Sequence, residues 1–220
     1  ADHVVELGAG NSDKTRAVLD AFAKARRLAH ISVLDVSGDF LERSAAELAS
    51  VYVDSQVHAV VGDFEEHLGS IPTDGTRIVL LLGGTIGNMD PDQRRDFLAS
   101  IADTLRPGDA FLLGTDLVKD IDRLELAYDD PAGITAAFNL NILNVINHEL
   151  DADFDLDEFE HHSFFDADNQ WIDLGLRSLS AQTVTIADLG LTVGFDKSEV
   201  MRTEISAKFT PGRIAGELAE

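Results

Sequence analysis

The chain has 220 residues, 45% of them hydrophobic, which is enough to bury the core of one large domain or of one domain with an insertion. Forty acidic and seventeen basic side chains give a net charge of -23, which repels phosphate backbones, so we expect no nucleic-acid partner. The lack of cysteine excludes disulfides and thiolate metal sites and favours a cytoplasmic location. No apolar run approaches the roughly 20 residues of a membrane span, so we expect no membrane partner.

Residues 1–118 alternate between short apolar runs and amphipathic stretches, a pattern typical of a parallel sheet with helices between its strands. The predicted strands are residues 3–7, 30–36, 57–61, 77–82 and 110–113. The predicted helices begin at Asn11 or Ser12, near Phe40, and at Pro91. The apolar run at 77–82 is continuous, as expected for a central strand that is covered on both faces.

The first predicted strand runs directly into the glycine loop Gly8-Ala9-Gly10. Glycines allow backbone N–H groups to approach a nucleotide-type cofactor closely, and the following helix offers its positive N-terminal end. The dinucleotide fingerprint requires a third glycine where this chain has Asp13, an acid that would sit badly against a pyrophosphate. The loop therefore favours a less negative cofactor such as S-adenosylmethionine. A plain helix-capping turn is the alternative interpretation of the loop on its own.

Polar and glycine residues also follow the other predicted strands, at the edge where an open parallel sheet binds ligands. Asp35 ends the second strand, where a carboxylate can accept from both hydroxyls of a ribose. Asp63 and Phe64 end the third strand, where an acid and an adjacent backbone N–H can read an adenine edge. A glycine-rich run from Gly83 to Asn88 follows the fourth. One acid at a strand end is more often a turn or cap residue, but four such features at successive strand ends favour a cofactor site. The pair Asp63 and Phe64 favours a methyl donor over a nicotinamide.

From residue 119 the pattern changes to helices and then to antiparallel strands. Residues 120–150 predict helices that are interrupted at residues 129–131. The predicted apolar face of the second helix consists of Phe138, Ile142, Val145 and Ile146. Residues 159–209 predict antiparallel strands, with period-two alternation over 178–186 and 191–195. We interpret residues 1–118 as a cofactor-binding domain, residues 119–209 as a substrate-binding insertion, and residues 210–220 as an incomplete return to the first domain.

The sequence predicts no metal site. An acidic stretch at 151–155 imitates the start of a calcium loop, but Leu156 and His162 stand where the loop requires a glycine and a bidentate glutamate. The adjacent His161 and His162 would point to opposite faces of a strand, so a structural or surface role is the better interpretation of both.

Seven stretches stand out along nearly the whole chain. They are ELGAGNSDKT at 6–15, GDF at 62–64, GTIGN at 84–88, LGTDLVKD at 113–120, AYDD at 127–130, FN at 138–139 and RTEIS at 202–206. Together they resemble the histidine-specific Nα-methyltransferases of ergothioneine biosynthesis, which use S-adenosylmethionine. The resemblance implies an α/β fold, with the Rossmann-like doubly wound sheet of class I methyltransferases and an α+β substrate-binding insertion. Members of that family extend further at both ends, so the resemblance also implies a chain truncated at both ends.

The resemblance implies residue roles as well. The positions that match cofactor-binding residues are Gly8, Gly10, Lys14, Asp35, Asp63 and Phe64. Asn88 and Tyr128 match the residues that hold the α-amine and carboxylate of L-histidine, and Gly83 matches a position at the junction between donor and acceptor. Glu204 and Ser206 match the pair that reads the imidazole. An imidazole offers one donor and one acceptor, which a carboxylate and a hydroxyl two residues apart on one strand face can satisfy.

The implied reaction is repeated in-line attack of a neutral α-amine on the sulfonium methyl, giving trimethylhistidine (hercynine). No residue is identified as a dedicated catalytic base. Three alternatives stay open on the residues alone: methylation of another amino acid or amine, a non-catalytic module that binds S-adenosylmethionine, and a nicotinamide oxidoreductase, which Asp13 disfavours. No oligomeric state is predicted.

Overall fold

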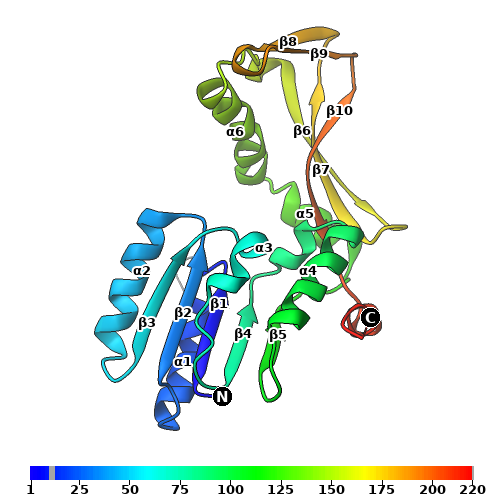
Figure 1. The fold of residues 1–220 in the computed structure, drawn as a ribbon. Helices are drawn as coiled ribbons and strands as arrows, with labels where there is room; N and C mark the ends of the chain where they lie inside the picture. Colours follow the sequence, from blue (N-terminus) through cyan, green and yellow to red (C-terminus); the bar gives the residue numbers. More distant parts are fainter. Residues whose placement is uncertain (10–12, 220) are drawn as a thin grey trace. The chain divides into compact units, whose positions relative to one another are not determined.

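The computed structural model describes residues 1–9 and 13–219, which divide into two units (Figure 1). The first unit comprises Ala1–Ile86, Asp90–Thr115 and the residues from Glu217 onward. The second comprises Gly87–Met89 and Asp116–Gly216. Each unit contains its own β-structure and its own buried apolar cluster.

The first unit contains a five-stranded parallel sheet in the order β3-β2-β1-β4-β5. Its strands are β1 (His3–Leu7), β2 (His30–Asp35), β3 (Gln56–Val61), β4 (Arg77–Leu81) and β5 (Ala110–Leu113). In β1, Leu7 lies opposite Leu34 of β2 on one side and Leu81 of β4 on the other. This is the strand order of a Rossmann-like doubly wound sheet, so the predicted fold class is confirmed.

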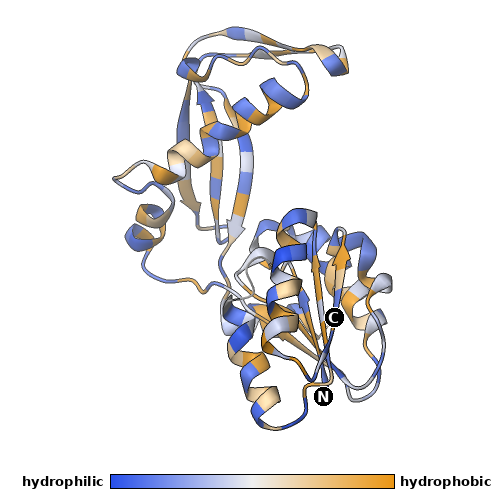
Figure 2. Ribbon diagram, turned by 90° about the vertical axis from the view of Figure 1, so that its left-hand side faces the viewer, coloured by the Kyte–Doolittle hydropathy of each residue, from blue (hydrophilic) through white to orange (hydrophobic). Residues whose placement is uncertain are grey.

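Helices cover this sheet because its strands are apolar on both faces. They are α1 (Asp13–Lys24), α2 (Gly38–Val51), the short α3 (Phe64–His67) and α4 (Pro91–Thr104). Leu19 of α1 and Leu41 of α2 join one buried cluster with Val4 and Val33 of the sheet, so α1 and α2 cover the same face. The alternate strand residue Val5 is buried as well, and Figure 2 shows the strands mostly hydrophobic and the helices two-toned. The predicted capping residues before α1 lie outside the described part of the chain.

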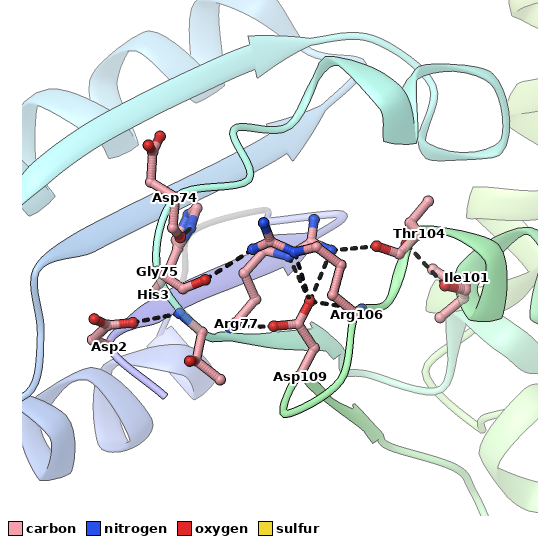
Figure 3. A network of polar contacts seen from close by, with 10 residues as sticks. Asp2, His3, Asp74, Gly75, Arg77, Ile101, Thr104, Arg106 and Asp109 are labelled. Atoms are coloured by element: carbon pink, nitrogen blue, oxygen red, sulfur yellow. Dashed lines mark hydrogen bonds and ion pairs between the residues drawn. The ribbon is translucent and has the colours of Figure 1, made fainter.

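A buried ion pair joins the starts of β4 and β5 (Figure 3). The Nε of Arg77 donates to Asp109 at 2.9 Å, its backbone amide donates at 2.7 Å, and the amide of Arg106 donates at 3.1 Å. Both side chains of the pair are at most 3% exposed. Burial by itself raises the pKa of Asp109, but these donors outweigh burial and lower the pKa to about 2.

The second unit is built from antiparallel strands and helices. A three-stranded sheet has the order β10-β7-β6, and β8 pairs with β9. The strands are β6 (Phe159–Asp166), β7 (Trp171–Ser178), β8 (Gln182–Ile186), β9 (Leu191–Phe195) and β10 (Val200–Ala207). The helices are α5 (Ile121–Tyr128), α6 (Ile134–Glu149) and α7 (Pro211–Glu217). The last residue of α7, Glu217, belongs to the first unit. No helix in the described part of the chain is long and apolar enough to cross a membrane.

Two sequence predictions for the second unit are wrong, the first of them only in part, because Ile146 of the predicted apolar face does pack against the buried cluster of this unit. The helix α6 turns Asn139 and Leu143 inward, whereas Phe138 and Val145 are 71% and 51% exposed. The helix α6 is rotated about its axis relative to the prediction because the side-chain amide of Asn139 donates to the carbonyl of Gly175 at 3.0 Å, which holds Asn139 inside. Residues 178–186 are also not one strand, because the chain turns between Ser178 and Gln182.

Candidate cofactor and substrate sites

The strand order of the first unit reverses at the junction of β1 and β4, the place where such sheets bind ligands beyond the carboxyl ends of their strands. Gly8 follows β1 with φ +65°, and Gly83 and Gly84 follow β4 with φ +91° and +85°. Glycine is favoured at these left-handed angles, and without a Cβ the backbone stays open to a ligand. Gly8 of the predicted glycine loop and the first two glycines of the glycine-rich run therefore lie at the switch point.

Two predicted cofactor residues lie against these glycines. The ring of Phe64 is 3.8 Å from the place a Cβ of Gly8 would occupy, and the Nζ of Lys14 is 3.0 Å from the corresponding place at Gly83. Phe64 is held by an edge contact with the ring of Phe97, at 5.5 Å between centroids. The structure thus brings together Gly8 with Phe64 and Gly83 with Lys14, whereas Gly10 lies outside the described residues.

The carboxylates at the next two strand ends both have local backbone partners. Asp35 accepts a hydrogen bond from the amide of Ser37 at 3.0 Å, and Asp63 caps α3 by accepting from the amide of Glu65 at 2.9 Å. The turn or cap role that is common for such acids is therefore real here. These bonds also fix both carboxylates at the ligand-binding edge of the sheet.

A buried hydrogen bond joins Glu6 of β1 to Thr15 of α1. Both side chains are buried, and the hydroxyl of Thr15 donates to the carboxylate of Glu6. This bond ties β1 to α1 across the glycine loop. Glycines whose missing Cβ atoms leave a cradle, an aromatic ring at its wall and strand-end carboxylates form a set that fits S-adenosylmethionine.

In the second unit, the predicted substrate residues Tyr128 and Ser206 contact each other. Tyr128 is the last residue of α5, and its hydroxyl oxygen lies 2.8 Å from the Oγ of Ser206 on β10. Sequence reasoning assigned them to different parts of the amino acid, whereas the structure makes them one hydroxyl pair. The pair also contacts Lys208, whose Nζ lies 2.7 Å from both oxygens and 4.7 Å from the centre of the Tyr128 ring.

Sequence reasoning missed Lys208. Its side chain is 1% exposed, and its ammonium lies 3.5 Å from the carboxylate of Asp116. Burial by itself raises the pKa of Asp116, but Lys119 and Lys208 outweigh burial and lower it. The signal that could have found Lys208 is the period of two that puts it on the strand face of Glu204 and Ser206.

Glu204 is half-buried on β10, and the structure gives it a carboxylate that resists ionisation. Burial raises the pKa of Glu204, and the positive charge of Lys208 opposes that rise in part. Glu204 and Ser206 of β10 and Lys208 just after it thus follow one another at every second position and offer a carboxyl group, a hydroxyl and an ammonium.

Asn88 lies in a single turn of 3₁₀ helix, Thr85–Asn88, and its side chain is exposed. The preceding Gly87 packs on the end of β10, because a Cβ at Gly87 would lie 2.9 Å from the carbonyl oxygen of Ala207. Asn88 is therefore attached to a segment that contacts the residue between Ser206 and Lys208.

The end of α5 is held by a histidine that we predicted to be structural. His161 is 2.8 Å from the backbone carbonyl of Tyr128 through Nε2, and its Nδ1 is 3.0 Å from the amide of Asn139. These contacts are satisfied when Nε2 of His161 donates to the carbonyl of Tyr128 and Nδ1 accepts from the amide of Asn139. Among the described residues no cluster of three or more His, Asp or Glu could hold a metal ion.

Comparison with known proteins gives a consistent result. A family model described as a histidine-specific methyltransferase, SAM-dependent, matches residues 1–220. Histidine N-alpha-methyltransferase of Mycolicibacterium smegmatis is 52% identical over 220 residues, covering 100% of this chain and 68% of that protein. The protein of the same name in Mycobacterium tuberculosis is 48% identical over 219 residues, with the same two shares. Ergothioneine biosynthesis protein 1 of Schizosaccharomyces pombe is 35% identical over 173 residues, covering 75% of this chain and 22% of that protein.

Proposed function

Because the chain belongs to the family of histidine-specific, S-adenosylmethionine-dependent methyltransferases, we propose that it methylates the α-amine of L-histidine. The product would be trimethylhistidine (hercynine), in ergothioneine biosynthesis, the process named in one relative. The observation that carries the proposal is the strand face of β10, on which Glu204 and Ser206 stand two residues apart beside Tyr128.

That strand face matches an imidazole in its hydrogen-bonding groups. A neutral imidazole has one N–H donor and one acceptor nitrogen, so a carboxylate and a hydroxyl can satisfy both. We assign the N–H to Glu204 and the acceptor nitrogen to Ser206. A site with such buried polar groups rejects an amino acid without ring nitrogens, by roughly 10⁴-fold in comparable enzymes. We assign the α-amine and carboxylate of the substrate jointly to Asn88, whose amide can donate, and Tyr128, whose phenol oxygen can accept.

We assign the cofactor to the first unit and the substrate to the second. The residues that would hold S-adenosylmethionine are Gly8, Gly10, Lys14, Asp35, Asp63 and Phe64, with Gly83 where donor and acceptor meet. When bound, the cofactor supplies a methyl group that a sulfonium has already activated. The left-handed Gly8 and the wall formed by Phe64 support the assignment, because a side chain at position 8 would fill the cradle.

The protein's main contribution to the reaction would be orientation. Holding the amine nitrogen in line with the methyl carbon lowers a barrier by up to roughly 7–11 kcal/mol in well-oriented systems. We assign no residue as a dedicated base and propose that the amine binds in its neutral form and loses its proton to water. A rate that stayed flat as the pH passed through the amine's ionisation would contradict this assignment.

Mass spectrometry of L-histidine incubated with the chain and S-adenosylmethionine tests the proposal. We expect successive mass increases of one methyl group, up to three. If another amino acid is methylated and histidine is left unchanged, that amino acid is the substrate and the assignment to histidine is wrong. Cofactor binding without any methylated product would indicate a non-catalytic binding module. The net charge of -23 and the lack of cysteine support the further proposals of no nucleic-acid partner and a cytoplasmic location.

A further inference from the structure

Lys208 is a buried cation whose three ammonium protons face three acceptors. Its Nζ lies 2.7 Å from the hydroxyl oxygens of Tyr128 and Ser206, and 3.5 Å from a carboxylate oxygen of Asp116. A lysine ammonium can only donate, so both hydroxyl oxygens accept from it. Nothing in the proposed methyl transfer uses this lysine directly.

The remaining protons of the hydroxyl pair can then be counted. Tyr128 and Ser206 are 2.8 Å apart, so one of them donates to the other. A phenol is a stronger hydrogen-bond donor than an aliphatic alcohol, and Lys208 lies 2.7 Å from both oxygens and so does not reverse this order. If Tyr128 donates, the oxygen of Ser206 accepts twice, from Lys208 and from Tyr128, and both of its lone pairs are occupied. Ser206 is then left with one group to offer a ligand, its own hydroxyl hydrogen.

We propose that Lys208 is a positioning residue that sets this proton order, from Lys208 and Tyr128 to Ser206 and on to the ligand, and thereby determines ring specificity. This inference rests on the proposed function for the nature of the ligand. Glu204, two residues before Ser206, offers an acceptor. The strand face thus selects a neutral ring that brings an acceptor nitrogen to Ser206 and an N–H to Glu204, which is a single tautomer of imidazole.

Infrared spectroscopy tests the proton order without any ligand. The phenol C–O stretch falls when the oxygen accepts a hydrogen bond and rises when the hydroxyl donates. The chain has two tyrosines, and Tyr52 is a built-in reference because its hydroxyl donates to Asp20 at 2.7 Å. With ring-labelled tyrosine, and Tyr52→Phe to assign the bands, we expect the Tyr128 band to lie below that of Tyr52, which only donates, and above the frequency of a phenol that only accepts. Lys208→Met should raise it, and the exposed Lys197→Met should leave it unchanged.

Binding of ring analogues tests the specificity. β-(Pyrrol-2-yl)-alanine keeps one N–H but has no acceptor nitrogen, so it leaves the hydroxyl of Ser206 without a partner. We expect the wild-type chain to bind it about tenfold or more weakly than L-histidine. In Lys208→Met the ratio should shrink to about threefold or less, because Ser206 regains a free lone pair and can rotate. Lys208→Arg, which keeps a donating cation, should retain most of the discrimination.

The outcomes separate this inference from the proposed function. In the wild-type chain, a Tyr128 band at the frequency of the Tyr52 band, or as low as that of a phenol that only accepts, overturns the proton order. This measurement does not depend on whether a Lys208 variant folds. An unchanged ratio of affinities in folded Lys208→Met overturns the role in specificity. A Tyr128 band between these two limits, in a chain that fails to bind histidine, supports the proton order and contradicts the proposed substrate.

Discussion

Glu204 is the residue on which histidine recognition depends most directly. In the proposed complex its carboxylate accepts the imidazole N–H, and a hydrogen bond to a charged group contributes about 1.5–3 kcal/mol. We therefore expect Glu204→Ala to weaken L-histidine binding by roughly 10- to 100-fold and S-adenosylmethionine binding by less than about twofold. Isothermal titration calorimetry of the two ligands measures both effects. The control is Glu149→Ala, whose side chain is 67% exposed, and an equal loss of both affinities would contradict the assigned role.

The carboxylate of Glu204 should also destabilise the folded protein when no ligand is bound. Burial raises the pKa of Glu204 in the folded state, so the folded chain binds this proton more tightly than the unfolded chain. The contribution of Glu204 to the free energy of unfolding therefore grows as the pH falls through the raised pKa and is lost as the pH rises. We expect Glu204→Gln to raise the melting temperature at neutral pH while weakening histidine binding. A variant that melts lower than the wild type at neutral pH would show that the carboxylate is favourably solvated.

At the scale of elements, the ion pair between Arg77 and Asp109 fixes the start of β4 against the start of β5. Asp109→Ala leaves the buried guanidinium without its carboxylate, and breaking a buried pair costs about 3–5 kcal/mol. Denaturant unfolding measures the change. The exposed pair of Arg95 with Asp92 is the matched control, and Asp92→Ala should cost no more than about 1 kcal/mol.

The pH dependence of that ion pair has the opposite sign to that of Glu204. The pKa of Asp109 is lowered from 3.8 to about 2, so its stabilisation is present above the unfolded value and is lost as the pH falls toward 2. The wild-type chain should therefore lose free energy of unfolding between about pH 4 and pH 2 more steeply than Asp109→Ala does. Parallel acid profiles for the two chains would mean that the donors around Asp109 do not stabilise its ionised form.

Asn139 supports the end of α5 from α6. Its side-chain amide contacts both the ring of His161 and the carbonyl of Gly175, at 3.0 Å each. Asn139→Ala leaves buried groups unpaired, at a cost of about 1–3 kcal/mol in unfolding free energy. It should also weaken histidine binding, because His161 holds the backbone of Tyr128. Asn144→Ala, on the same helix but exposed, is the control in thermal unfolding, and equal melting temperatures for the two variants would contradict the role of Asn139.

The sequence predicts the elements of the first unit well because each strand is an apolar run closed by a glycine or an acid. The rotation of α6 was not predictable in the same way. Phe138 is more hydrophobic than Asn139, and only the partners of Asn139, distant in sequence, explain why the amide is inside. Lys208 was missed for a related reason: a lysine is expected at the surface, and its burial depends on Tyr128 and Asp116 of other segments.

At the scale of the whole molecule, the dominant property is the net charge of -23, which surrounds the chain with a negative field. S-adenosylmethionine carries a net charge of about +1 at neutral pH, because its sulfonium and ammonium exceed its carboxylate by one charge. Its demethylated product, S-adenosylhomocysteine, is neutral overall and nearly identical in shape. The field should therefore attract the methyl donor and leave the product nearly unaffected, which favours exchange of product for donor.

Stopped-flow binding at two salt concentrations tests this consequence. Raising the ionic strength from about 0.01 M to about 0.15 M shortens the Debye length from roughly 30 Å to roughly 8 Å. We expect the association rate constant of S-adenosylmethionine to fall by up to about tenfold and that of S-adenosylhomocysteine to change by less than about twofold. Salt-induced changes in the protein itself would affect both ligands alike, so an equal fall in both rate constants would mean that the charge of the chain does not steer the cofactor.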